Sequence, residues 1–337
     1  MRIKVFILCV FLIPFNSRAS EQIDWSLFRG TTTGFSESLI GKQTNNPSQL
    51  AQDESLFINF FSIKAAVGNT AVSLLQDVDE LDSDPKNLDP LFLGTLNGLS
   101  QTTIGFSKNG ISFSGFANGE ASAKISNPIF PEIKGAIYGD FGGVLGYSKR
   151  ISEELSVGGA ARISYIKGVT INADIIDSLV GVPIPGFAGI NLESSLGVIY
   201  SHKKGSTPNI VLDDTQFTAT VSNLKLYDNL DVNVRNPIKA SIGLRKGFEF
   251  SSQYSQKITA YSQFDLTRNN LFGGLGLEYF PIKQLGLAFG FSNGELSAGL
   301  TSNLLFFNIQ IGTYTKEEFY QSKERIYSLG ISFFLDQ

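Results

Sequence analysis

The sequence predicts an all-β fold: a transmembrane antiparallel up-and-down β-barrel of about fourteen strands with an N-terminal plug segment. Hydrophobic residues make up 42% of the chain and charged residues only 17%, below the ~25% charge of a typical water-soluble domain. No stretch approaches the ~18 consecutive apolar residues of a transmembrane helix. Instead, short segments alternate between apolar and small polar residues, and turns rich in Gly, Asn and Pro separate them, which is the pattern of strands.

The first residues have the form of an export signal. Arg2 and Lys4 provide a basic start, an apolar run follows over Val5 to Pro14, and Ser17-Arg18-Ala19 supplies a small-x-small cleavage pattern. We expect cleavage after Ala19. Because Cys9 is the only cysteine of the chain, the exported protein would have neither a disulfide nor a thiolate metal site.

We therefore expect three parts: a signal peptide over residues 1–19, an N-terminal plug or periplasmic segment over 20–54, and the transmembrane barrel over 55–337. A barrel of about fourteen strands is wider than the eight-stranded kind that its own side chains can fill. We predict that Arg29 to Asn46 lies inside or across the barrel and restricts it.

Alternation is clearest in the C-terminal third. In Leu285 to Ser292, Leu and Phe occupy one face while Gly, Ala and Ser occupy the other, and Asn293-Gly294 then tolerates the positive φ angles of a tight hairpin. A soluble β-sandwich would also alternate, but its outward face would be rich in Lys, Glu and Asp, whereas the polar face here is mostly Gly, Ser, Ala, Thr and Asn. The strands predicted in this way lie near residues 55–64, 102–108, 111–118, 134–149, 155–171, 189–201, 216–226, 237–248, 257–267, 270–280, 285–292, 296–300, 304–313 and 327–335.

The predicted connections are long on one side and mostly short on the other, as in membrane barrels. If the C-terminus is periplasmic, the long extracellular connections are 68–99, 119–133, 172–188 and 227–236. The short periplasmic turns include 109–110, 151–154 and 281–284. His202 to Thr215 is an exception, because it is long for a periplasmic turn. The first connection is expected to be partly helical, since Val72, Leu75, Val78 and Leu81 recur near helical spacing.

The last strand has the form of a barrel-assembly signal. Its pattern, polar-x-Gly-x-x-aromatic-x-apolar, falls on Ser328, Gly330, Phe333 and Leu335. We therefore predict that the barrel-assembly machinery is a partner of this chain. The other expected partners are the lipid bilayer and the lipopolysaccharide of the outer membrane of a Gram-negative bacterium.

Over most of residues 40–337, the chain resembles the outer-membrane long-chain fatty-acid transporter superfamily. This group includes aromatic-hydrocarbon transporters and secretion-associated barrels. The similar segments are Asn46-Pro47-Ser48-Gln49-Leu50-Ala51, Gly146 to Gly168, Val221 to Leu224, Pro237 to Leu244 and Leu275 to Tyr279. The resemblance implies a barrel of about fourteen strands whose N-terminal segment is tucked into the lumen. Arg29 to Asn46 is more polar than the Gly/Ala-rich plug of the family, so ligand gating need not be shared.

The alternation places eight charged residues on the face opposite the aromatic side chains of their strands, and we expect them in the lumen. They either pair into networks that fill the lumen or form a polar path for a solute or a gate on the plug. Unpaired Lys or Arg on the lipid face would cost ~2–4 kcal/mol at the midplane. The eight are Asp140, Arg162, Glu193, Lys239, Arg245, Lys257, Asp265 and Glu278.

An apolar loop is expected over Asn172 to Ala188, with two prolines. In the resembled transporters, apolar outer loops form a groove for hydrophobic ligands. Alternatively, the loop packs over the barrel mouth or lies in the lipopolysaccharide layer. Its apolar residues are Ile175, Ile176, Leu179, Val182, Ile184 and Phe187.

Enzymatic and nucleic-acid functions are not expected. His202 is the only histidine and lies in a hydrophilic turn, so neither a Ser–His catalytic pair at the outer rim nor a transition-metal site is predicted. The loop carboxylates of Asp77, Asp79, Asp82 and Asp84 are an alternative calcium site, but this acidic run lacks the glycine of a calcium loop and a solvated acidic loop is favoured. Loss of Arg2, Lys4 and Arg18 with the signal leaves 24 basic against 31 acidic residues, which argues against nucleic acid as a partner. No cofactor is expected.

Two functions therefore stand side by side. The first is passive transport of hydrophobic small molecules, such as fatty acids or hydrocarbons, across the outer membrane. It rests on the resemblance and on the apolar loop. The second is a non-transporting barrel that acts as a protein partner in secretion or in cell-envelope structure. It rests on the atypical plug and on the short loops between the C-terminal strands.

Overall fold

A computed structural model describes the chain over residues 46–52, 55–76, 95–126, 132–174, 186–205, 207, 210–230, 238–250, 256–267, 271–292, 295–304, 306–317 and 323–336. The 3₁₀-helix η2 (Pro47–Ala51) precedes the first strand, and the short helix α3 (Asn69–Gln76) follows it. The strands are β1 (Phe57–Gly68), β2 (Thr95–Lys108), β3 (Ile111–Ser126), β4 (Glu132–Arg150), β5 (Leu155–Asp174), β6 (Gly186–Lys204), β7 (Ile210–Asp228), β8 (Lys239–Phe250), β9 (Lys257–Thr267), β10 (Leu271–Ile282), β11 (Leu285–Ser292), β12 (Glu295–Leu304), β13 (Phe307–Glu317) and β14 (Lys323–Asp336).

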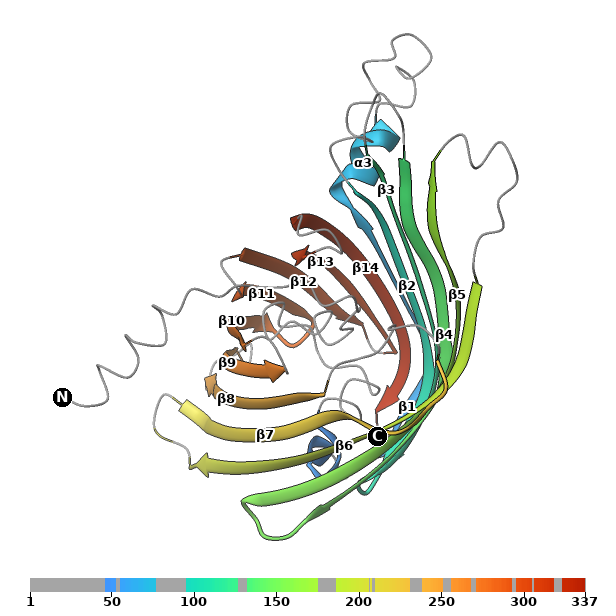
Figure 1. Cartoon of the computed structure of the whole chain (residues 1–337). Coiled ribbons are helices and arrows are strands. Elements are labelled where there is room, and N and C mark those ends of the chain that lie inside the picture. Colours follow the sequence, from blue (N-terminus) through green and yellow to red (C-terminus); the bar gives the residue numbers. More distant parts are fainter. Residues whose placement is uncertain are drawn as a thin grey trace, which may run out of the picture.

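The fourteen described strands form one closed barrel (Figure 1). Each strand pairs antiparallel with its neighbours in sequence, and β1 closes the ring by pairing with β14. Closure satisfies the backbone hydrogen bonds of every strand without leaving a free edge, which a strand in lipid requires. The predicted up-and-down barrel of about fourteen strands is therefore confirmed.

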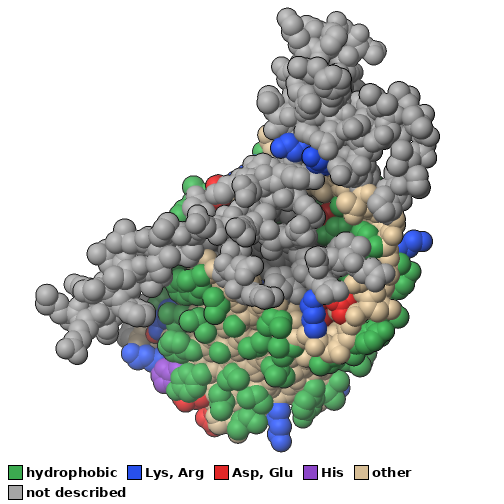
Figure 2. Space-filling model, in the orientation of Figure 1, with side chains coloured by type: hydrophobic (Ala, Val, Ile, Leu, Met, Phe, Trp, Pro, Cys, Tyr) green, Lys and Arg blue, Asp and Glu red, His purple; other side chains and the backbone are tan. Residues whose placement is uncertain are grey.

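Side chains alternate between the outside and the lumen along each strand. In β6, Gly197 and Ile199 are buried, whereas Leu196 and Val198 are 57% and 41% exposed. The same alternation places large apolar side chains on the outside of all parts of the ring, and Figure 2 shows them over much of the visible outer wall. An outward apolar face on a closed barrel is the architecture of an outer-membrane protein. None of the described helices is long and apolar enough to span a bilayer.

The two ends of the barrel differ in their connections. At the end where β14 finishes, β2 and β3 are joined by Asn109-Gly110, and β10 and β11 by two residues. Gly110 has φ +79° there, and a Cβ on it would lie 2.3 Å from the Ser148 carbonyl oxygen, so only glycine fits this turn. The connections at the other end reach much greater length, over 69–94 and 175–185. Short turns belong to the periplasmic side of such barrels, and this assignment is used below.

The wall of the barrel is uneven in height. Strands β4 to β7 have 19 or 20 residues, whereas β8 to β13 have 8 to 12. A tilted strand needs only ~9–11 residues to cross a bilayer. In Figure 1 the long strands β4 and β5 rise above the upper ends of β11 to β14.

Several predicted strand ends are wrong. The connection over His202 to Thr215 is not long, because β6 continues to Lys204 and β7 begins at Ile210. Similarly, β3 runs to Ser126, so much of the loop predicted over 119–133 is strand, and β2 begins at Thr95 rather than near 102. A helix does follow β1, at α3, but Val78 and Leu81 lie outside the described residues.

Candidate functional site in the barrel lumen

The eight charged residues predicted to face the lumen alternate with outward apolar neighbours. Asp140, Glu193, Lys239 and Glu278 are at most 8% exposed. Arg162, Arg245, Lys257 and Asp265 are partly buried. Each lies on the inner face of its strand; Asp265, for example, stands between Phe264 and Leu266, which are 39% and 57% exposed. The lumen therefore gathers side chains of both charges.

The clearest pair joins β4 to β5. The Arg162 guanidinium donates to the Asp140 carboxylate, and the same guanidinium lies 4.6 Å from the centre of the Phe116 ring on β3. The ion pair and the ring contact together hold the Arg162 side chain against the inner wall. The pair lies on the inner wall, about midway along β4 and β5.

Next to this pair lies Glu193, on β6. Its side chain is 2% exposed, and one carboxylate oxygen accepts a 2.8 Å hydrogen bond from the Asn191 amide. In register, Glu193 stands directly opposite Arg162 across β5 and β6. The acidic residue thus extends the Asp140–Arg162 pair around the inner wall.

A second polar group spans β8 to β10. The Lys239 ammonium lies 3.8 Å from the Asp265 carboxylate, which also accepts a 2.6 Å hydrogen bond from Gln263. The Tyr261 hydroxyl donates to Glu278 at 2.7 Å. Two of the predicted lumenal residues, Lys239 and Asp265, therefore form an ion pair here. A third, Glu278, accepts a hydrogen bond from Tyr261.

The segment just before β1 enters the lumen. Within η2, Ser48 and Leu50 are 0% and 2% exposed, and η2 contacts β4, β5 and β6. It lies against Gly158 and Gly197, which face each other in register across β5 and β6. A Cβ on Gly158 would lie 2.6 Å from the Ser48 nitrogen, and one on Gly197 would lie 2.3 Å from Asn46 Oδ1. The two glycines thus provide the hollow that this helix occupies.

A chain of hydrogen bonds ties η2 to the following strands. The Gln52 amide donates to the Ser201 hydroxyl at 2.8 Å, and Gln216 donates to the Gln52 carbonyl oxygen at 3.2 Å. Arg245 in turn donates to Gln216 at 3.1 Å, and its guanidinium lies 5.9 Å from the centre of the Tyr261 ring. The polar side of the lumen is therefore connected from β6 to β9 through the first described residues of the chain.

Towards the extracellular end, the inner face becomes apolar. One buried cluster joins Ala66, Leu99, Tyr314 and Ile326, from β1, β2, β13 and β14. A second joins Ile166, Phe187 and Leu230, and Tyr138 of β4 packs against both clusters. The Tyr138 hydroxyl points to Glu120 and donates to it at 2.7 Å. We call these eight apolar and aromatic residues the lumenal apolar layer.

Of the apolar loop residues, Phe187 is not in the loop. It lies in β6, is 9% exposed, and belongs to the lumenal apolar layer. Strand β6 begins at Gly186, three residues before the predicted start at 189, because Gly186 already pairs with Val169 of β5. Ile175, Ile176, Leu179, Val182 and Ile184 lie outside the described residues.

The predicted assembly signal occupies β14 with the expected faces. Ser328 and Gly330 are buried on the inner face, while Phe333 is 46% exposed on the outer face and Leu335 follows near the strand end. Its recognition by the assembly machinery stays a prediction.

The only histidine lies at the periplasmic rim. His202 Nδ1 is 3.2 Å from a Glu154 carboxylate oxygen, and the Tyr200 hydroxyl donates to the other at 2.8 Å. These two hydrogen bonds, Tyr200 first, lower the pKa of the Glu154 carboxyl. Among the described residues, no group of three His, Cys, Asp or Glu side chains is placed to hold a metal ion.

Sequence alone did not reveal the docking of η2, the hydrogen-bond chain through Gln52, or the lumenal apolar layer. The first needs the register that sets Gly158 opposite Gly197. The layer mixes residues from strands far apart in the sequence, and each contributes one or two apolar side chains to an otherwise polar face. One sequence feature could have indicated the lumenal apolar layer: a single large apolar residue, such as Leu99 or Phe187, among the small and polar residues of a strand's inner face.

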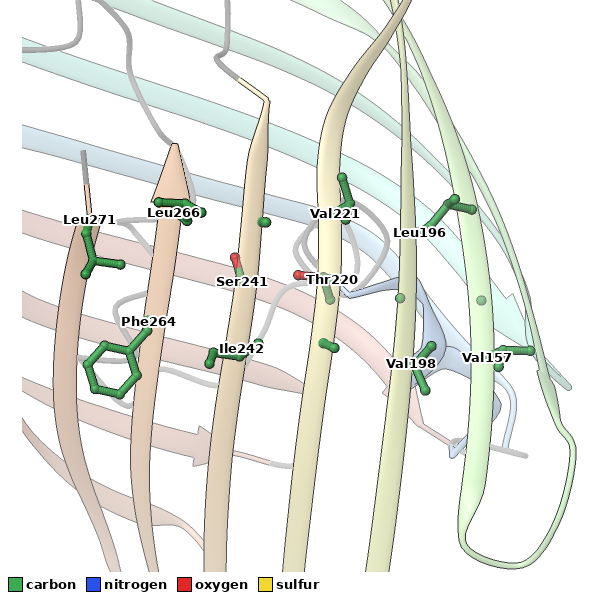
Figure 3. Close-up of a pocket in the computed structure, with 14 residues that line it drawn as sticks. Val157, Leu196, Val198, Thr220, Val221, Ser241, Ile242, Phe264, Leu266 and Leu271 are labelled. Carbon is green, nitrogen blue, oxygen red and sulfur yellow. The ribbon is translucent and has the colours of Figure 1, made fainter. Parts of the chain in front are cut away.

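The outer wall also carries a concave site. A groove of about 710 Å³ crosses β5 to β10 and is lined almost wholly by apolar atoms. Figure 3 shows its side chains in two rows that run from strand to strand. One row is Val157, Val198, Ala219, Ile242 and Phe264, and the other is Leu196, Val221, Ala240, Leu266 and Leu271. Because Leu196, Ile242 and Leu266 are about three-fifths exposed, the groove opens outward and not into the lumen.

No protein-family model and no curated protein matches the sequence. Among solved structures, the barrel is similar to the toluene transporter TbuX of Ralstonia pickettii, with 12% identity, a TM-score of 0.46, and 86% of this chain and 92% of that chain covered. It is also similar to the Pseudomonas putida toluene transporter TodX, with 8% identity, a TM-score of 0.43 and 95% of each chain covered. A third is the transport unit of the Escherichia coli autotransporter AIDA-I, with 11% identity, a TM-score of 0.41, and coverage of 91% and 96%.

Two of these structures are aromatic-hydrocarbon transporters, the group named by the sequence resemblance.

Proposed function

We propose that this outer-membrane barrel passively transports hydrophobic small molecules through its lumen. The observation that carries the proposal is the lumenal apolar layer near the extracellular end. The lumen of a water-filled barrel is usually lined by polar residues, yet Leu99, Ile166 and Phe187 face inward here and are at most 9% exposed. These side chains pack against one another, so an apolar solute that enters separates them and is removed from water between them, which is worth ~0.8 kcal/mol per buried methylene.

The polar groups below this layer suit a passive path. Asp140 pairs with Arg162 and Lys239 with Asp265, so four of the eight predicted lumenal charges form ion pairs. An uncharged molecule that passes these two pairs meets opposite charges side by side rather than a single ion. No group among the described residues supplies an energy source, and transport would follow the concentration gradient.

Uptake in cells tests the proposal. The barrel would be expressed in a Gram-negative host that lacks its own channel for hydrophobic compounds, and entry of radiolabelled toluene and oleate would be measured. Phe187→Ser, inside the layer, should lower uptake about tenfold, because burying a Phe side chain is worth ~1.5–3 kcal/mol. Phe291→Ser is the matched control, since Phe291 is an outward residue that is 44% exposed.

Heat-modifiability on gels would establish that both variants fold. Uptake by the wild type no faster than by cells without the barrel, for both compounds, would rule the proposal out.

A second function is favoured by the height of the wall. Strands of 19 or 20 residues in β4 to β7 exceed the ~9–11 needed to cross a bilayer, so this side offers strand surface beyond the membrane to a protein partner. A stoichiometric complex that survives purification from the native host, together with no uptake, would favour this partner role over transport.

A further inference from the structure

The outer groove over β5 to β10 has a defined path across the membrane-facing wall. Its two rows follow the register of the sheet: Val157 pairs with Val198, Val198 with Ala219, and Ala219 with Ile242. Five steps between neighbouring strands of ~4.8 Å each give a length of ~24 Å. Since the strands of such barrels tilt by ~35–45°, the groove runs obliquely through the apolar belt.

Small residues form its floor. Ala219 lies between Val198 and Ile242 in one row, and Ala240 lies between Val221 and Leu266 in the other. Both alanines are exposed, and their register neighbours in each row carry larger side chains. The volume of about 710 Å³ is within the ~300–1,000 Å³ range of ligand pockets. The wall is thus hollowed where an apolar chain could lie along the strands' hydrogen-bonding direction.

The groove has a polar end and an apolar end. Beyond Val157, the same row continues on β4 to Lys149, which is the register partner of Val157. Lys149 is exposed, lies one residue before the end of β4, and makes no ion pair in the described part of the chain. The second row continues to Tyr147, which is 58% exposed, an amphipathic residue at the membrane–water interface. At the far end stand Leu266, Leu271 and Phe264.

We propose that this groove binds one acyl chain of an anionic phospholipid from the periplasmic leaflet, with the headgroup phosphate at Lys149. The cation and the aromatic ring lie at the periplasmic rim, where the headgroups of that leaflet lie. The apolar rows continue from them into the hydrocarbon belt, and acyl chains already surround that belt. The occupant is therefore a lipid, and the site is independent of the transport path proposed for the lumen.

Native mass spectrometry of the delipidated barrel, titrated with palmitoyl-oleoyl phosphatidylglycerol, tests the site. Filling the floor with Ala219→Phe and Ala240→Phe should lower the affinity for one bound lipid about tenfold, because the acyl chain loses several methylene contacts. The matched control is Ala65→Phe with Ala117→Phe, at exposed outward positions on β1 and β3. Lys149→Ala should lower the affinity about fivefold, and Lys283→Ala, at another periplasmic turn, should leave it unchanged.

All variants change outward residues, and heat-modifiability would show that each barrel is folded. Equal phosphatidylglycerol affinity in the filled variant and the wild type would overturn the proposal. So would a wild-type dimer that becomes monomeric in the filled variant while lipid binding persists, because the groove would then be a contact between two copies of the chain.

Discussion

Two glycines determine where the chain meets the inner wall before the first strand. Gly158 and Gly197 are register partners, and the hollow above them admits the backbone of η2 and the Asn46 side chain. Larger residues on the same inner face, such as Ile199, leave no such space. The Gln52 hydrogen bonds to Ser201 and Gln216 then hold the end of this segment. The docking of η2 thus depends on the absence of side chains at Gly158 and Gly197 as well as on the hydrogen bonds of Gln52.

Gly197→Ala should loosen η2. The added Cβ would stand 2.3 Å from Asn46 Oδ1 and 3.3 Å from the Pro47 side chain, so the helix must shift. We expect a loss of ~1–3 kcal/mol in the free energy of unfolding from overpacking, measured by urea unfolding in vesicles, and faster proteolysis near residues 46–52.

Gly247→Ala is the control for this variant, because a Cβ at this buried inward position would have no neighbour closer than 3.8 Å. Equal stability of the two variants would mean that the contacts of η2 do not hold it in place.

At the scale of elements, alternation predicts strands wherever lipid meets the wall. Apolar outward residues are required there, so Leu285 to Ser292 shows a period of two and coincides with β11. The requirement ends where a strand leaves the membrane. The polar start of β7, with Asp213 and Asp214, and the small residues at the end of β3 therefore resemble loops in the sequence although they pair as strands. Strand existence was predictable for this physical reason, and strand length was not.

Alternation within β13 can be tested directly, because the exported chain is expected to contain no cysteine. Phe307 faces outward, whereas Asn308 is 5% exposed on the inner face. We expect a water-soluble thiol reagent to label a cysteine at 308 faster than one at 307, and a lipid-soluble reagent to show the reverse preference. Faster labelling of 307 by the water-soluble reagent would mean that the register is shifted by one residue, which inverts every side chain.

Over the whole molecule, the lumen changes character along its axis. Apolar side chains line the extracellular end, the Asp140–Arg162 pair lies midway, and η2 with its amide hydrogen bonds lies near the periplasmic end. The sequence alone predicted that the eight charged residues face inward, because the alternation within each strand distinguishes its inner face from its outer face. The sequence could not predict how the apolar and charged side chains are distributed along the barrel axis, since Leu99 and Ile326 meet only when β1 and β14 close the ring. The signal peptide over 1–19 stays a prediction.

The position of η2 bears on the predicted plug. Asn46 is 5% exposed against Gly197, so the described chain begins inside the lumen rather than at its rim. Arg29 to Asn45 lies outside the described residues. Because a barrel of about fourteen strands exceeds what its own side chains fill, and because small residues line much of the inner face, a segment that starts from Asn46 has space within the lumen.

Deleting Ser20 to Thr44 should therefore leave a folded barrel with greater single-channel conductance in planar bilayers. The deletion keeps Asn46 and all of η2, so the contacts with Gly158 and Gly197 persist and any increase reflects the removed segment alone. A second variant, Gly197→Ala in the full-length chain, separates blockage from anchoring, since it loosens η2 without removing residues. Unchanged conductance of the deletion variant, with heat-modifiability retained, would place the segment outside the pore and leave the lumenal apolar layer as the restriction that a solute meets.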